Sequence, residues 1–242
     1  MTVEQDPAAV LDLPEWAKRL VVFDTETTGL NLSTARLVTA CIAELDENGN
    51  LVGQALEWLI NPGVEIPEAA ASVHGISTAR AQAEGVDPAR AISEIVETLN
   101  GYLSAGVAVV AYNAPYDFTI LRNDAERNGV TPLMNPNPVL DPLVIDKALD
   151  KWRKGSRVLG ATAAHYGVVL ENAHNATSDA LAAGNIMQAI ARRFNKELAG
   201  PLAELHGKQI AWSNEQTLSF ADWKHRNGEP TFEAKLGWPE KS

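Results

Sequence analysis

The chain has 242 residues, 45% of them hydrophobic, and a formal net charge of −11 at pH 7. This size and apolar content predict one α/β domain with an appendage, able to bury a full core without disulfide bonds. The negative charge argues against a protein that holds long nucleic acids by broad neutralisation of phosphates. A small basic groove or bound metal ions remain compatible with an acidic body.

Three features of the sequence bear on its compartment. The N-terminus is acidic, and no basic region followed by an apolar one marks it as a signal. No apolar run approaches the roughly 20 residues that span a bilayer. The single cysteine, Cys41, lies in an apolar stretch, which is typical of a packed side chain in a reducing compartment. The sequence therefore predicts a cytoplasmic protein without a membrane segment.

Strands come first along the chain and then alternate with helices. An Asn48-Gly49 pair between two β-rich runs is a strong hairpin signal, and Pro115 is a favoured first-turn residue of a helix. This order predicts an α/β fold, a mixed twisted sheet with helices on both faces. In chain order, we expect strands at 20–23, 36–46 and 51–60, helices at 67–73 and 88–103, a strand at 107–111, a helix at 115–128, a short strand at 139–144, and helices at 158–166 and 177–194.

Composition divides the chain into three parts. Residues 1–18 form a polar leader, residues 19–199 the main domain, and residues 200–242 a C-terminal extension that begins at Gly200-Pro201. The extension contains Trp212, Trp223 and Trp238, and we expect these side chains to pack it against the main domain.

Two acidic residues follow the first apolar run, as Asp24 and Glu26. Residues i and i+2 of a strand point to the same face, so the two carboxylates share one site. Unpaired, they would repel each other and take up protons, whereas a hard divalent cation such as Mg²⁺ or Mn²⁺ accepts both. A strand that simply turns polar as it reaches a loop is the plainer alternative for this pair.

Two more acids lie in the first turns of predicted helices. Asp117 shares a stripe with Ile120 and Leu121, and Asp179 lies on the buried face of its helix. The helix dipole favours the ionised form there, which is the form that binds a metal. Helix capping is the alternative role for each aspartate, but capping does not explain why both lie on apolar stripes.

A histidine precedes the last of these acids by five residues. This residue, His174, could take a proton from a metal-bound water, while His165 lies within a predicted helix and His74 lies in a loop suited to contact a substrate. A basic cluster between Lys147 and Arg157 is a candidate for a small basic groove, but a solvated helix face or loop is the expected explanation.

Three motifs, in this order and spacing, resemble those of the DEDDh superfamily of 3′–5′ exonucleases, similar to the proofreading epsilon subunit of bacterial DNA polymerase III. They are residues 24–29, 113–117 and 174–179, and the loop around His74-Gly75 also matches. The resemblance covers residues 19–195. Where the sister DEDDy class has a tyrosine four residues before the last aspartate, this chain has Asn175. The resemblance implies a ribonuclease-H-like fold and two-metal removal of mononucleotides from a 3′ end.

The resemblance also implies a role for each matching residue. Asp24, Glu26, Asp117 and Asp179 would hold two divalent cations, Mg²⁺ or Mn²⁺, with Asp117 acting directly or through water, and His174 would be the general base. The residues implied to bind substrate are Thr25, Thr27, Thr28, His74, Gly75 and Asn113.

The sequence leaves the substrate and the partners open. Single-stranded or frayed DNA is the expected substrate, for proofreading or repair, and trimming of RNA is the alternative because no residue clearly reads a 2′-hydroxyl. A non-catalytic module associated with a polymerase is a second alternative. Residues 216–220 resemble the short Gln-x-Leu-x-Phe peptides that bind the bacterial sliding clamp, which makes a clamp or a DNA polymerase a candidate partner, although packing of the extension explains the same residues.

Overall fold

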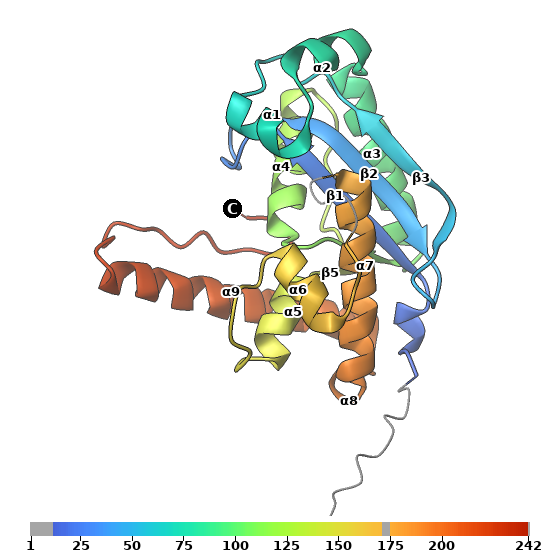
Figure 1. The fold of residues 1–242 in the computed structure, drawn as a ribbon, viewed down its shortest axis with the longest axis vertical. Helices are drawn as coiled ribbons and strands as arrows, with labels where there is room; N and C mark the ends of the chain where they lie inside the picture. The colour runs from blue at the N-terminus through green and yellow to red at the C-terminus, as the bar shows by residue number, and fades with distance from the viewer. Residues whose placement is uncertain (1–11, 171–174, 242) are drawn as a thin grey trace, which may run out of the picture.

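A computed structural model describes residues 12–170 and 175–241 and contains one mixed sheet (Figure 1). Its strand order is β3-β2-β1-β4-β5. The β1/β2 and β2/β3 pairs are antiparallel, whereas β1/β4 and β4/β5 are parallel. The mixed sheet predicted from the sequence is therefore present. The strands of the described residues are β1 (Leu20–Thr27), β2 (Leu37–Leu45), β3 (Leu51–Leu59), β4 (Ala108–Val110) and β5 (Val139–Leu140).

Helices cover both faces of this sheet. They are α1 (Glu68–His74), α2 (Thr78–Glu84), α3 (Pro88–Ser104), α4 (Pro115–Arg127), α5 (Pro142–Leu149), α6 (Leu159–Tyr166), α7 (Ala176–Arg193), α8 (Asn195–Leu198) and α9 (Leu202–Arg226), with a 3-10 turn at Glu15–Ala17.

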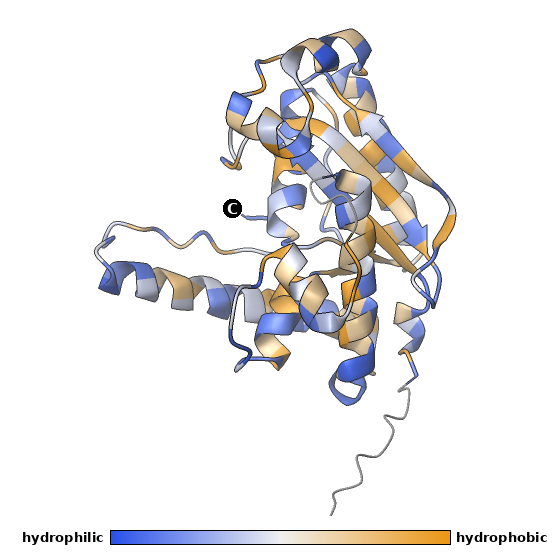
Figure 2. Ribbon diagram, in the orientation of Figure 1, coloured by the Kyte–Doolittle hydropathy of each residue, from blue (hydrophilic) through white to orange (hydrophobic). Residues whose placement is uncertain are grey.

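Alternation along the central strand β1 separates two hydrophobic layers. Val21 and Phe23 belong to the layer that includes residues of α3 and α4, whereas Leu20 and Val22 belong to the layer that includes residues of α7. This is the period-two pattern of a strand buried on both faces. Figure 2 shows hydrophobic residues where sheet and helices meet, and hydrophilic residues at the free end of α9. The prediction of helices on both faces is confirmed.

The predicted strand at 139–144 is wrong after its second residue. β5 ends at Leu140, and Pro142 begins helix α5. The Asp141 side chain accepts a hydrogen bond from the Leu143 N–H and caps this helix. An aspartate followed by proline at the first helical position is a helix start signal, and it overrides the β propensity of the valines.

Helix α9 was not expected from the sequence, and it completes the edge of the sheet. The Gln209 side chain accepts from the Asp141 N–H at 2.7 Å and donates to the Val139 carbonyl at 3.1 Å, while His206 Nδ1 accepts from the Val139 N–H. These side chains satisfy backbone groups of the edge strand β5, which would otherwise lack partners.

The three tryptophans that the sequence predicts to pack the extension against the main domain differ in burial. Trp238 is buried and its ring contacts His206, and Trp212 is half-buried against the core. Trp223 is half exposed instead. Residues 216–220, the candidate clamp-binding peptide, lie within α9, where Gln216 donates to the Val144 carbonyl at 2.9 Å.

Part of the predicted leader is ordered against the domain. The indole N–H of Trp16 donates to the Leu198 carbonyl, and the Ala17 carbonyl accepts from Gln188. Residues 1–11 of the leader lie outside the described residues. None of the helices that the structure describes has the length and apolar character needed to cross a membrane.

Candidate active site

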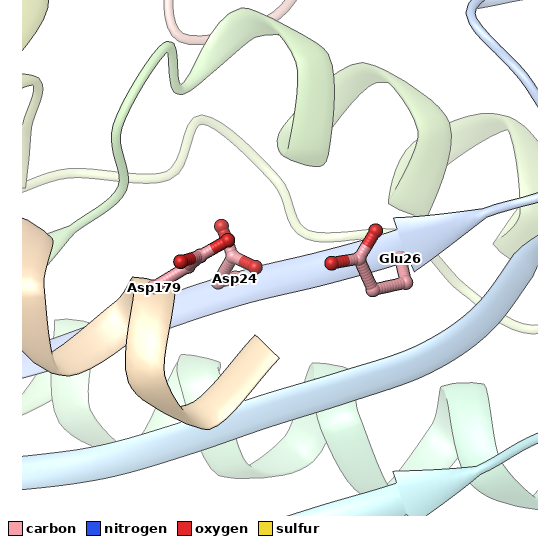
Figure 3. Close-up of side chains that lie close together, drawn as sticks. All are labelled: Asp24, Glu26 and Asp179. Atoms are coloured by element: carbon pink, nitrogen blue, oxygen red, sulfur yellow. The ribbon is translucent and has the colours of Figure 1, made fainter. Parts of the chain in front are cut away.

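Three carboxylates converge on one side of strand β1 (Figure 3). Asp24 and Glu26 come from β1, and Asp179 comes from the first turn of α7. Each offers an oxygen that lies within 4.8 Å of the oxygens from the other two. The i, i+2 spacing on the strand and the packing of α7 against β1 produce this cluster.

The electrostatics of the cluster favour a bound cation. Burial, and then the charges of Asp117, Glu26 and Asp179, raise the pKa of Asp24 well above its usual value. Burial and Asp179 raise the pKa of Glu26 to about 7. A divalent cation would keep these groups ionised, because hard cations bind carboxylate oxygens and offset their mutual repulsion. The donor set therefore fits a hard metal ion such as Mg²⁺ or Mn²⁺.

Asp117 lies beside this cluster but is not one of its three members. Its side chain is buried in the first turn of α4 and accepts a hydrogen bond from the Thr25 hydroxyl at 2.7 Å. Burial raises its pKa to about 7, although the Thr25 hydroxyl favours the ionised form. Thr25 thus points inward and orients Asp117.

The loop after β1 is fixed by a tyrosine that the sequence reasoning missed. The hydroxyls of Thr27 and Tyr116 lie within hydrogen-bond distance of each other, and each lies 2.9 Å from the Gly29 carbonyl oxygen, which accepts from at least one of them. The Thr28 hydroxyl accepts from the Arg36 N–H at the start of β2. Tyr116 lies 89 residues from Thr27 along the chain, so no local sequence pattern predicts this contact.

His74 and Gly75 lie at the end of α1, next to this loop. Gly75 ends the helix in the left-handed conformation with φ of 75°, which favours glycine. Burial lowers the pKa of His74, and the Thr27 backbone opposes that shift. The structure thus brings His74 next to Thr27, at the end of β1.

A second missed residue, Asp141, holds the loop that precedes α4. Its fully buried carboxylate accepts from the backbone N–H groups of Asn113 and Ala114, both at 3.0 Å. Asn113 is exposed and has a positive φ of 64°. Burial raises the pKa of Asp141 to about 6 against these hydrogen bonds. Asp141 therefore positions the loop from which Asp117 follows.

The histidine predicted as general base, His174, lies outside the described residues. Its neighbour Asn175 caps α7 by accepting from the Thr177 and Ser178 N–H groups, and this cap sets the helix end that presents Asp179. The competing His165 bonds Arg193 and lies 3.3 Å from an Asp150 oxygen.

Two members of the basic cluster point inward, which corrects the prediction of a solvated face for them. Arg153 and Arg157 both pair with the fully buried Asp146, Arg153 at 2.8 Å. The Tyr166 hydroxyl donates to the other Asp146 oxygen. Lys147, Lys151 and Lys154 remain exposed.

Comparison with known proteins places this architecture among nucleases. Residues 21–187 match the family model described as Exonuclease. A DNA polymerase III subunit epsilon-like protein of Rhodobacter capsulatus is 33% identical over 178 residues, which are 72% of this chain and 24% of that protein. A PolC-type DNA polymerase III of Lacticaseibacillus paracasei is 28% identical over 176 residues, 73% of this chain and 11% of the polymerase. The chain thus spans a quarter or less of these relatives.

Solved structures share the fold. Exonuclease I of E. coli in complex with a dA16 oligonucleotide has a TM-score of 0.64 at 20% identity, over 74% of this chain and 42% of that one. Exonuclease I from Methylocaldum szegediense has a TM-score of 0.62 at 21% identity, over 85% and 45% of the two chains.

The mixed sheet with acids on its central strand defines an α/β protein of the ribonuclease-H-like class, as the sequence predicted. Within that class, the chain belongs to the exonuclease family, since the family model covers most of its length. The resemblance to the DEDDh superfamily is confirmed.

Proposed function

We propose that this chain is a metal-dependent 3′–5′ exonuclease that releases mononucleotides from single-stranded or frayed DNA. The observation that carries the proposal is the cluster of Asp24, Glu26 and Asp179, a hard-cation ligand set on the central strand of an exonuclease-family fold. Asp117, beside it and oriented by Thr25, is the fourth acid of the set.

Two Mg²⁺ or Mn²⁺ ions would supply charge stabilisation for the attacking and leaving oxygens of the phosphodiester. The chain's own residues would do the rest. Asp24 and Glu26 hold their oxygens on one side of a rigid strand, which is pre-organised for this charge. His174 would accept the proton of the attacking water.

The substrate end would lie against the loop after β1. Tyr116 and Thr27 fix the Gly29 carbonyl, and His74 lies next to them, so this loop is a preformed wall for a terminal nucleotide. Thr28, Gly75 and Asn113 would complete the contacts with the strand. Trimming of RNA remains the second candidate, because the part of the site that the structure describes carries no evident discriminator of a 2′-hydroxyl.

The biological setting is a further part of the proposal. The relatives are DNA polymerase III proteins, which supports a role in proofreading or repair with a polymerase as partner, in the cytoplasm. The hydrogen bonds of Gln209 and His206 to β5 support the view that residues 200–242 are a packed part of the exonuclease domain. Residues 216–220 lie within α9, where Gln216 bonds the Val144 carbonyl. Leu218 and Phe220 are half exposed, however, so a sliding clamp stays a candidate partner beside packing.

The test is hydrolysis of single-stranded oligonucleotides labelled at the 5′ end. With Mg²⁺ or Mn²⁺ we expect a ladder that shortens one nucleotide at a time from the 3′ end, and no cleavage with chelator. Matched RNA, duplex DNA and 3′-blocked DNA define the substrate. Internal cuts, or equal cleavage in chelator, would refute the proposal.

A further inference from the structure

A groove lined by aromatic and basic side chains runs between α5 and α9. Its larger cavity has a volume of about 490 Å³, and its lining includes Lys147, Lys151, Trp212, Gln216, Phe220 and Trp223. None of these residues belongs to the candidate active site described above. Helix α9, which supplies four of them, lies beyond residues 21–187 that match the exonuclease family.

This groove continues toward the candidate active site. A neighbouring cavity of about 190 Å³ shares Lys147, Gln216 and Phe220 with the first, and it is also lined by Asn113 and Pro115. Asn113 lies in the loop before α4 and Pro115 is the first residue of that helix, which carries Asp117 in its first turn. The two cavities therefore form one path from the loop before α4 to the aromatic residues of α9.

The sheet topology explains this placement. Strands β1, β4 and β5 are parallel, so their carboxyl ends meet at one edge of the sheet. The metal-binding candidates lie toward the end of β1, and Asn113 and Asp141 follow the ends of β4 and β5. Neighbouring strands are about 4.8 Å apart, so the path from β1 to β5 crosses about 10 Å along this edge.

The aromatic side chains form an exposed stacking surface. The rings of Phe220 and Trp223 are 5.9 Å apart and nearly parallel, with an interplanar angle of 16°. Phe220 is 48% exposed and Trp223 is 50% exposed. Large apolar side chains exposed together on one helix mark a binding surface more often than isolated ones do. In Figure 1, the C-terminal part of α9 extends away from the rest of the fold.

The charge of the groove is opposite to that of the whole chain. Lys147, Lys151 and Lys241 line the two cavities. The acidic residues that line the cavities are Glu215 and Asp141, and Asp141 accepts hydrogen bonds from backbone N–H groups. Arg157 also lines the groove but pairs with Asp146. Excess lysine next to stacked aromatic rings matches the phosphates and bases of a single strand.

We propose that this groove binds the nucleotides of a single strand that lie upstream of the 3′ end held in the active site. Lys147 and Lys151 contact phosphates, and bases stack on Phe220 and Trp223. The proposal rests on the exonuclease function proposed above and extends it: the C-terminal helix makes the affinity of the enzyme depend on the length of its substrate.

The test compares oligothymidylates of three and twelve nucleotides. For the unmodified chain we expect the KM of the twelve-nucleotide strand to be lower than that of the three-nucleotide strand. Trp223→Ala should raise the KM of the long strand about fivefold or more, because a base stacked on an aromatic ring is worth ~1 kcal/mol or more. Lys151→Glu should also raise the KM of the long strand, and this KM should depend less steeply on salt than that of the unmodified chain, because one phosphate contact is lost.

The loop between α5 and α6, which contains Lys151, also offers a matched control for each variant. Lys154 and Trp152 are exposed, and neither lines the groove. Lys154→Glu makes the same charge change as Lys151→Glu, and Trp152→Ala the same truncation as Trp223→Ala. We expect both controls to keep the length dependence of the unmodified chain, and circular dichroism verifies that all four variants are folded.

The outcomes separate this proposal from the one on which it rests. If the unmodified chain degrades neither oligonucleotide, the exonuclease proposal fails. If it degrades both with equal KM, or if Trp223→Ala and Lys151→Glu match their controls, the groove is not a path for the strand. In that last case a peptide ligand for the same groove would be the next candidate.

Discussion

The pKa values of buried acids shift in opposite directions in two regions of this molecule. Asp146 is fully buried, and burial alone would raise its pKa, but hydrogen bonds from Arg153, Tyr166 and Arg157 outweigh burial and leave its pKa below the usual value. At Asp24, burial and three neighbouring acids act in the same direction, and the pKa rises well above the usual value.

The opposite pKa shifts distinguish an acid with a structural role, Asp146, from an acid of the candidate active site, Asp24. The chain supplies its own cations to Asp146, which thereby ties the α5–α6 loop to the domain. No arginine or lysine is among the causes of the pKa shifts of Asp24 and Glu26 in the described part of the chain. A carboxylate cluster of this kind costs stability unless a cation binds it, so its presence points to a metal-dependent task.

The largest expected effect is on catalysis. Asp24→Asn removes one metal ligand at nearly unchanged volume, and we expect it to lower exonuclease turnover by about 10³-fold or more, because charge stabilisation is usually the largest catalytic contribution. The same variant should melt at a higher temperature than the unmodified chain in chelator, since one repelling charge is gone. A fully active Asp24→Asn enzyme would contradict the metal-site assignment.

Asp146→Ala should act on stability instead. It leaves Arg153, whose side chain is 6% exposed, without its ion-pair partner, and we expect the free energy of unfolding to fall by about 3 kcal/mol. Urea unfolding measures this loss. Glu84→Ala, which breaks the exposed Arg80–Glu84 pair, is the control and should have little effect. Equal loss in both variants would mean that Asp146 is not a structural anchor.

The histidine variants test the proton transfer. His174→Ala should lower kcat by ~10²-fold or more with little change in KM, as expected for a general base. His165→Ala is the control, because His165 is paired with Arg193 and Asp150 on the surface. Loss of activity in His165→Ala, with His174→Ala fully active, would reverse the assignment of the two residues.

The smallest expected effect is a pH dependence of metal-free stability. The pKa values of Glu26 and Asp117 are raised to about 7 in the folded state. Between pH 4 and 7 the unfolded chain therefore loses these protons first, and the contribution of these groups to stability falls as the pH rises. Mg²⁺ should consequently raise the melting temperature more at pH 8 than at pH 5. A larger increase at pH 5 would contradict the raised pKa values.

Much of the site follows from rules that act along a few residues of sequence. Asp24 and Glu26 share a face because a strand has a period of two, and Asp179 joins them because it lies in the first turn of a helix that packs on that strand. The sequence also predicted the sheet with helices on both faces, because its strands and helices alternate with clear turn signals.

What the sequence did not predict depends on contacts between distant segments. Tyr116 bonds Thr27 across 89 residues, and Gln209 bonds the backbone of Asp141 across 68. Asp141 carries a local signal, the Asp-Pro start of a helix, but the β-rich residues on either side of it predict a continuing strand. Helix α9 has a mixed surface, because it packs at one end and is exposed at the other, so its apolar residues follow no clean period.

The central claim is that the cluster of Asp24, Glu26 and Asp179 binds divalent cations, and titration of the protein with Mn²⁺ tests it most directly. Calorimetry or the paramagnetic resonance of free Mn²⁺ counts the ions bound at pH 8. We expect two ions per chain for the unmodified protein and weaker binding with fewer ions for Asp24→Asn. Identical stoichiometry and affinity in the two proteins, or no binding to either, would contradict the account.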